Sequence, residues 1–300
     1  MMRADFPEIS VVMPVFNGED FIEEAIQSVV IQSFLDWELI IIDNYSTDNT
    51  KSIIDTFRDD RIKYRQFRNN GVIASSRNFG ISQSQGEFIA FLDADDFWYP
   101  NKLEVCMKEL HAGFDLVSHS EYWFWENGKR KLVHYPSGRR LQYRSLLMKG
   151  NGISTSSVIV KKDALRSVSF FSDNPEYVTV EDYDLWLRLA RENYKFENIR
   201  LALGEYRIHS NSAIRQQDQY DHAITEVLVS HFEAKDWKLW SFYAARRRLA
   251  LAVAESGRAS FESGNPGDAW KKFREAISIS PFSWRVWVLL LLSLPSVVLQ

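Results

Sequence analysis

The most constraining feature of this sequence is the alternation of short apolar runs with amphipathic segments along its first hundred residues. Between the runs, apolar residues recur at helical spacing in segments 21–31 and 74–84. Continuously apolar strands joined by helices predict an α/β fold, with a mainly parallel sheet covered by helices on both faces. The apolar runs are residues 9–15, 37–42, 62–67 and 87–92.

The rest of the chain predicts a mixed segment followed by a helical one. Asn127 and Gly128 mark a hairpin turn, and residues 182–193 and 197–209 read as a helix and a strand. Residues 210–219 are polar and lack apolar periodicity, which is typical of a linker. We therefore expect two domains, an α/β domain over residues 1–215 and an all-α extension over residues 216–300.

Composition excludes several classes of protein. The 36 basic and 40 acidic residues give a net charge of -4, so no chain-wide positive field favours nucleic acid as a partner. The single cysteine, Cys106, excludes an internal disulfide and a thiolate zinc site and fits a reducing compartment. The first residues lack the apolar stretch of a signal peptide. These features predict a cytoplasmic location.

The helical extension leaves two interpretations open. Ala269, Phe273 and Ala276, followed by Pro281, resemble one tetratricopeptide-type hairpin. The apolar segment 286–299 is shorter than the ~20 residues that cross a bilayer. It either packs inside its own domain or lies on the inner face of a membrane as a peripheral contact, which Trp284 and the cluster at residues 246–248 would support.

The segment Leu92-Asp93-Ala94-Asp95-Asp96 carries the strongest chemical signal. Three carboxylates at a strand end repel one another in an apolar crevice unless a cation neutralises them. Oxygen ligands favour Mg²⁺ or Mn²⁺, which commonly bridges a protein carboxylate to substrate phosphates. The alternative is an acidic turn that caps the next helix.

Two further side chains are expected near the same sheet edge. Asp43 ends the second apolar run, where it can accept a hydrogen bond from a base or ribose, or else cap a helix. Arg77 projects from a predicted helix and could pair with a diphosphate, although an isolated arginine is more often a surface residue.

Taken together, four segments in order are similar to the motifs of the family 2 glycosyltransferases, which have the GT-A fold. They are VVMPVFNGEDFIEEAIQSVVIQSF, ELIIIDNYSTDNT, ASSRNFGISQSQGEFIAFLDADD and VEDYDLWLRLA. The resemblance covers residues 9–212 and leaves out the helical extension. One departure is that Asn44 and Tyr45 stand where the family usually has Asp and Gly, which puts the local loop shape and the donor preference in question.

The resemblance implies roles for individual residues. Asp95 ligates the divalent ion, Asp93 contacts the ribose or the ion, and His209 completes the metal shell or touches the diphosphate. Asp182 is the catalytic base, with Glu181 as its close competitor. The implied nucleotide-sugar site consists of Pro14, Val15, Phe16, Asn17, Asp43, Arg77, Asp93, Ala94 and Asp95.

The expected activity is metal-dependent, inverting transfer of a sugar from a nucleoside diphosphate, most simply UDP, to a hydroxyl group of a glycan or a lipid-linked acceptor. Cell-surface polysaccharide synthesis is the process that the resemblance implies. Two alternatives stay open, a nucleotidyltransferase and a non-catalytic module that binds a sugar nucleotide or a partner. The first loop holds one glycine and no lysine, which disfavours the nucleotidyltransferase.

Overall fold

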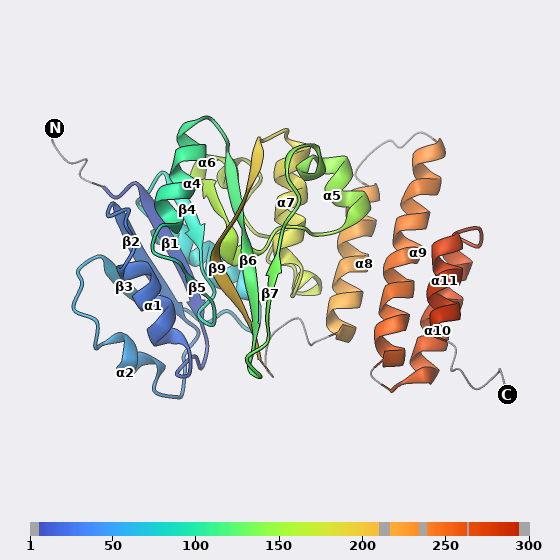
Figure 1. Ribbon diagram of the computed structural model, residues 1–300, viewed down its shortest axis with the longest axis horizontal. Helices are drawn as coiled ribbons and strands as arrows, with labels where there is room; N and C mark the ends of the chain where they lie inside the picture. Colours follow the sequence, from blue (N-terminus) through green and yellow to red (C-terminus); the bar gives the residue numbers. More distant parts are fainter. Residues whose placement is uncertain (1–5, 210–216, 234–238, 263, 294–300) are drawn as a thin grey trace. The chain divides into compact units, whose positions relative to one another are not determined.

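The computed structural model describes residues 6–209, 217–233, 239–262 and 264–293 (Figure 1). The chain divides into two compact units. The first comprises residues 1–146, 150–175 and 181–212, and the second comprises residues 147–149, 176–180 and 213–300. The predicted boundary at residues 215 and 216 lies outside the described residues, so the domain division stays a prediction.

Four parallel strands form one half of the sheet of the first unit, in the order β3-β2-β1-β4. Every residue of β1, β2 and β4 is buried, because helices cover both faces of a parallel sheet and leave no solvent side. The strands are β1 (Ile9–Val15), β2 (Trp37–Asp43), β3 (Ile62–Gln66) and β4 (Phe88–Phe91).

The other half of the sheet is mixed, and the order continues β8-β6-β9-β5. Strand β8 is antiparallel to both β4 and β6, whereas β6 and β9 run parallel. The predicted GT-A type α/β sheet is confirmed, but only its first half is wholly parallel, because β8 and β5 pair antiparallel with their neighbours in the second half. These strands are β5 (Phe97–Trp98), β6 (Leu116–Trp125), β8 (Ile159–Lys161) and β9 (Phe196–Ile208), and β7 (Arg130–Val133) forms the predicted hairpin with β6.

Several helices of the first unit pack against this sheet. Helix α3 lies against β1 and β2, and α4 lies against β6 and β9. Ile22, Ile26 and Val29 of α1 join the core beside Trp98. The helices are α1 (Ile22–Val30), α2 (Thr50–Ile54), α3 (Ile73–Gln83), α4 (Lys102–His111), α6 (Lys162–Ser167) and α7 (Glu181–Arg191). Helix α5 (Tyr143–Lys149) begins in the first unit, and its last three residues belong to the second.

The second unit is helical, as predicted, with a small core of its own around Phe273 and Ala276. Helix α8 begins at Gln217, so the last three residues of the predicted linker are helical. Among the described residues, none of the helices has the length and apolar character that a bilayer span requires. The helices are α8 (Gln217–Glu233), α9 (Leu239–Glu262), α10 (Pro266–Ile279) and α11 (Trp284–Leu292).

Candidate nucleotide-sugar site

The carboxyl ends of β2 and β4 bring the first two predicted acids to one edge of the sheet. Strand β1 pairs in parallel with both strands, so Asp43 at the end of β2 and Asp93 just after β4 lie on the same side of the sheet. Asp43 is fully buried, whereas a quarter of the Asp93 side chain is exposed. The edge therefore combines an inaccessible carboxylate with an accessible one.

Asp43 is held by donors from its own unit. Its Oδ1 accepts hydrogen bonds from the backbone N–H and the hydroxyl of Ser46, at 2.9 and 2.6 Å. Its Oδ2 accepts from the Tyr64 hydroxyl at 2.5 Å, and burial together with the neighbouring carboxylate raises the pKa of Tyr64. Asp43 thus fixes the loop after β2, and its predicted contact with a base stays a prediction.

The first loop is tied to the loop after β2. The backbone N–H of Asn17 donates to Ser46 Oγ at 2.8 Å, and Asn17 Oδ1 accepts from the backbone N–H of Thr47 at 2.8 Å. Pro14 and Val15 are buried in β1, while the Phe16 ring is 59% exposed. A β-carbon on Gly18 would lie 3.9 Å from Ala94 Cβ, so this loop borders the acidic segment. Of the first-loop residues Pro14 to Asn17, Phe16 therefore presents an exposed aromatic ring on which a nucleotide base could stack.

Tyr45 shows the physical consequence of the departure in this loop. Its φ of 60° lies in the left-handed region, which glycine enters without a steric penalty and other residues do not. The guanidinium of Arg68 lies 4.9 Å from the Tyr45 ring centroid, a cation–π contact that offsets part of the cost. The loop therefore keeps the backbone that a glycine would favour.

Arg77 joins the two acidic motifs of the site, which are the segment 92–96 after β4 and the pair Glu181 and Asp182 at the start of α7. Its Nη2 donates to Asp93 Oδ1 at 2.8 Å and its Nη1 donates to Glu181 Oε1 at 2.5 Å. The Arg77 side chain is 3% exposed, and desolvated carboxylate pairs hold a guanidinium firmly. Arg77 is therefore a buried bridge between α3, the end of β4 and the start of α7, and its predicted contact with a diphosphate stays a prediction.

Asp182 lies next to this bridge at the start of α7. Its Oδ2 accepts hydrogen bonds from Thr155 Oγ1 at 3.0 Å and Asn151 Nδ2 at 3.2 Å. Desolvation and the adjacent Glu181 carboxylate raise the pKa of Asp182 to about 7, although Arg77 and Thr155 act in the opposite direction. A carboxyl group that titrates near neutral pH can exchange a proton with a bound hydroxyl group.

Two contacts position the metal-binding candidates. His209 Nε2 lies 2.9 Å from Asp95 Oδ2, and this hydrogen bond raises the pKa of His209. Asp96 Oδ1 accepts from the backbone N–H of Arg207 at 2.8 Å. Burial and the charges of Asp95 and Asp93 raise the pKa of Asp96 well above its usual value. The third acid of the segment thus secures the end of β9 and places His209 beside Asp95.

Two residues of this site had no role in the sequence interpretation. Thr155 contacts Asp182, and Ser156 contacts both Asp96 and the backbone of Asp93. Their only sequence signal is a run of small hydroxyl residues before β8, a pattern common in loops. Such a run does not reveal its partners, because the contacts span 27 to 63 residues.

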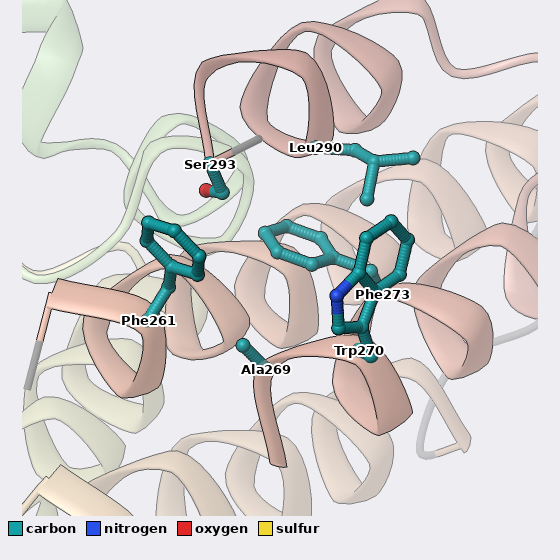
Figure 2. A pocket seen from close by; sticks show the side chains of 6 residues that line it. All are labelled: Phe261, Ala269, Trp270, Phe273, Leu290 and Ser293. Atoms are coloured by element: carbon teal, nitrogen blue, oxygen red, sulfur yellow. The ribbon is translucent and has the colours of Figure 1, made fainter. Parts of the chain in front are cut away.

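The described residues hold no group of three or more His, Cys, Asp or Glu side chains arranged as a metal cluster. A small hollow lies instead in the helical unit (Figure 2), and its lining carries no charged side chain. It offers nothing that would bind a diphosphate. The lining residues are Phe261, Ala269, Trp270, Phe273, Leu290 and Ser293.

Comparison with known proteins identifies the first unit. The model of the family described as Glycosyl transferase family 2 matches residues 10–169. The putative teichuronic acid biosynthesis glycosyltransferase TuaG of Bacillus subtilis is 31% identical over 211 residues, which is 69% of this chain and 81% of TuaG. The glucosyltransferase WfgD of Escherichia coli, which uses UDP-Glc and α-D-GlcNAc-diphosphoundecaprenol by its name, is 31% identical over 205 residues, covering 68% and 78% of the two chains.

Solved structures share the fold. Staphylococcus aureus TarS 1–349 in complex with UDP-GlcNAc superposes with a TM-score of 0.67 at 18% identity, over 94% of this chain and 83% of TarS. The mannosyltransferase PcManGT of Pyrobaculum calidifontis, in complex with GDP-Man and Mn²⁺, gives 0.62 at 15% identity, over 91% and 76%. The strand order, the linked acidic motifs and the family match lead to one conclusion: the chain belongs to glycosyltransferase family 2 and is a glycosyltransferase with a GT-A fold.

Proposed function

We propose that this enzyme transfers a sugar, with inversion, from a UDP-sugar to a hydroxyl group of a glycan or lipid-linked acceptor, with a divalent cation at Asp93 and Asp95. The observation that carries the proposal is the Arg77 bridge. Because one guanidinium contacts both Asp93 and Glu181, the cation motif and the start of α7 border the same space. The transfer needs this proximity, since donor and acceptor must meet between cation and base.

The donor set fits Mn²⁺ or Mg²⁺. About a third of the Asp95 side chain and a quarter of the Asp93 side chain are exposed, so their oxygens can reach a ligand. His209 adds an imidazole nitrogen next to Asp95. Cations of this kind keep waters and take substrate phosphate oxygens, so two or three protein ligands suffice. When bound, the cation stabilises the negative charge of the departing diphosphate.

Asp182 fits the role of base better than Glu181. Glu181 is buried and its Oε1 is engaged by the Arg77 guanidinium, so it is poorly placed to contact an acceptor hydroxyl. Asp182 is partly exposed and has a pKa of about 7. Its carboxylate would take the proton of the acceptor hydroxyl as the oxygen attacks the anomeric carbon. One displacement inverts that carbon and needs no covalent intermediate.

The test is nucleoside diphosphate release from a panel of UDP-, GDP-, dTDP- and ADP-sugars with Mn²⁺ or EDTA. We expect release from a UDP-sugar that depends on the cation. Asp182→Asn should keep UDP affinity and lose about 10²-fold or more in turnover, whereas Asp95→Ala should lose the cation dependence of UDP binding. Asp163→Asn, at a carboxylate 87% exposed, is the matched control. Pyrophosphate as the product would indicate a nucleotidyltransferase, and unchanged turnover of Asp182→Asn would remove Asp182 from the role of base.

The outer face of α11 supports peripheral membrane contact as a further part of the proposal. Val286 of this helix is buried in the core of the unit, yet Trp284, Trp287, Leu291 and Leu292 are 43% to 69% exposed. A helix that is apolar all round needs a cover for its outer face. Residues 276–300 contain Arg285 and no acidic residue, which matches an anionic lipid surface rather than a basic one.

Sedimentation with lipid vesicles tests this contact. We expect the full chain to bind vesicles that contain phosphatidylglycerol more strongly than vesicles of phosphatidylcholine alone, and to lose binding on Trp284→Ser with Leu291→Ser. Leu35→Ser, at a residue 61% exposed, is the control and should bind like the wild type. Absence of binding by the wild type would refute the contact, and light scattering that shows a dimer broken by the double variant would assign the face to a second copy.

A further inference from the structure

One short turn touches both acidic motifs. The turn η2 (Thr155–Ser157) precedes β8 and is buried along its whole length. Its first two residues point their hydroxyls at different motifs, and its third, Ser157, donates within the turn to the carbonyl oxygen of Ser154 at 2.7 Å. Buried hydroxyls are costly unless they are hydrogen-bonded, so the direction of each one is fixed by its partner.

Ser156 holds the cation motif. Its Oγ donates to Asp96 Oδ2 at 2.5 Å and accepts from the backbone N–H of Asp93 at 3.1 Å. Its carbonyl oxygen accepts from Trp98 Nε1 at 2.7 Å. Since Asp96 also accepts from the backbone of Arg207, Ser156 is part of the set of contacts that fixes both the acidic segment and the strand leading to His209.

Thr155 holds the base. Its Oγ1 donates to Asp182 Oδ2 at 3.0 Å, and Thr155 is 7% exposed. A hydrogen bond to the charged form of a carboxylate stabilises that form. It also restricts the rotation of the side chain, which matters because a base displaced by about 1 Å loses much of its rate.

We propose that Thr155 and Ser156 are positioning residues for glycosyl transfer: through one rigid turn they set the distance between the cation-binding acids and the base Asp182. The inference rests on the proposed function. The two hydroxyls are consecutive in the chain, so neither motif can shift without moving the other. Because Thr155 contacts Asp182 whereas Ser156 contacts the acidic segment, removing the Thr155 hydroxyl should affect the base, and removing the Ser156 hydroxyl should affect cation-dependent UDP binding.

The charged groups that face Asp182 are Glu181 on its own helix and Arg77 on α3. Glu181 raises the pKa of Asp182, and Arg77 and Thr155 lower it. Thr155→Val removes only the hydroxyl at almost constant volume, and the other two groups stay in place. The acidic limb of the pH–rate profile should therefore move to higher pH.

The experiment measures donor hydrolysis against pH, with the most active UDP-sugar of the panel, and UDP affinity in Mn²⁺ by calorimetry. For Thr155→Val we expect UDP affinity within about twofold of the wild type, an acidic limb at higher pH and turnover at pH 7 lowered about tenfold or more, as the loss of one hydrogen bond to a carboxylate implies. Thr155→Ser should restore both. Ser156→Ala should weaken UDP binding about fivefold or more and leave the limb in place.

Ser157→Ala is the matched control, because Ser157 belongs to the same turn and contacts neither motif. It should behave as the wild type in both measurements. The inference would be overturned if Thr155→Val, Ser156→Ala and Ser157→Ala lost turnover and UDP affinity to the same extent. It would also be overturned if the acidic limb of Thr155→Val did not move. A wild-type protein that releases no diphosphate from any donor would instead refute the proposed function, and melting curves that match the wild type ensure that each variant is folded.

Discussion

Replacement of Arg77 by methionine tests the bridge between the two acidic motifs. Methionine keeps the length and most of the volume of the side chain but removes its charge and its donors. Among the described residues, Glu181 then keeps no side-chain hydrogen-bond donor, because Arg77 donates to its Oε1 and its Oε2 has no partner there. Asp93 loses one contact but stays accessible to water. Most of the cost therefore arises at Glu181.

The magnitude follows from the burial of the pair. The side chains of Arg77 and Glu181 are 3% and 8% exposed, and breaking a buried pair by removing one partner costs about 3–5 kcal/mol. For a unit of this size that loss corresponds to a fall in melting temperature of roughly 6–20 °C. The double variant Arg77→Met with Glu181→Gln removes the charge left behind on Glu181, so it should recover a large part of the lost free energy of unfolding.

Urea unfolding at pH 7.5, followed by tryptophan fluorescence and by circular dichroism, measures the free energy of unfolding of the wild type, Arg77→Met and the double variant. Arg166→Met is the control, because this arginine is 63% exposed and pairs with an exposed Asp163; its loss should stay within about 0.5 kcal/mol. A loss below about 1 kcal/mol for Arg77→Met, or no recovery in the double variant, would refute the bridge.

Three further predictions concern single residues. The kcat of donor hydrolysis should fall as pH drops below about 7, because Asp182 accepts a proton only when ionised and its pKa is raised to about 7; a flat profile from pH 5 to 8 would contradict this. Lys102 is buried over the Trp98 ring, its Nζ has no hydrogen-bond partner among the described residues, and burial lowers its pKa to about 7. An unfolded lysine binds its proton up to about pH 10, so wild-type stability should rise with pH from about 7 to 10, and urea unfolding of Lys102→Met should show higher stability at pH 7 and a weaker pH dependence. The Tyr45→Gly variant should be more stable than the Tyr45→Ala variant by about 1 kcal/mol in thermal melts, because alanine keeps the steric cost of a left-handed backbone and glycine does not. Equal stability of the two variants would contradict the strain.

The parts of the fold that the sequence predicted are those set by local periodicity. The parallel strands β1 to β4 and helices α1 and α3 follow from apolar runs and helical spacing, and the hairpin from Asn127 and Gly128. The two-residue strand β5 was missed because so short a segment has no period, and its pairing with β9 joins residues about a hundred positions apart. The antiparallel insertion of β8 between β4 and β6 is likewise a matter of topology rather than local pattern.

For the candidate site, the sequence predicted the acidic residues but not their contacts. Asp43, Asp93, Asp95 and Asp182 could be predicted because they follow apolar strands or belong to an acidic motif. The partner of each could not, since Arg77 reaches Glu181 across 104 residues of chain. The position of Asp43 in the sequence likewise does not reveal that its side chain is buried and accepts hydrogen bonds from residues such as Tyr64. Burial and pairing are properties of the assembled sheet edge, and the sequence carries them only indirectly.

A crystal structure of the full chain with UDP and Mn²⁺, with the cation located by its anomalous scattering, tests the central claim most directly. We predict one anomalous peak within about 2 Å of a carboxylate oxygen of Asp95, in contact with the diphosphate, with Asp182 facing the free side of the diphosphate. A cation bound away from Asp93 and Asp95, or a diphosphate held elsewhere on the chain, would contradict it.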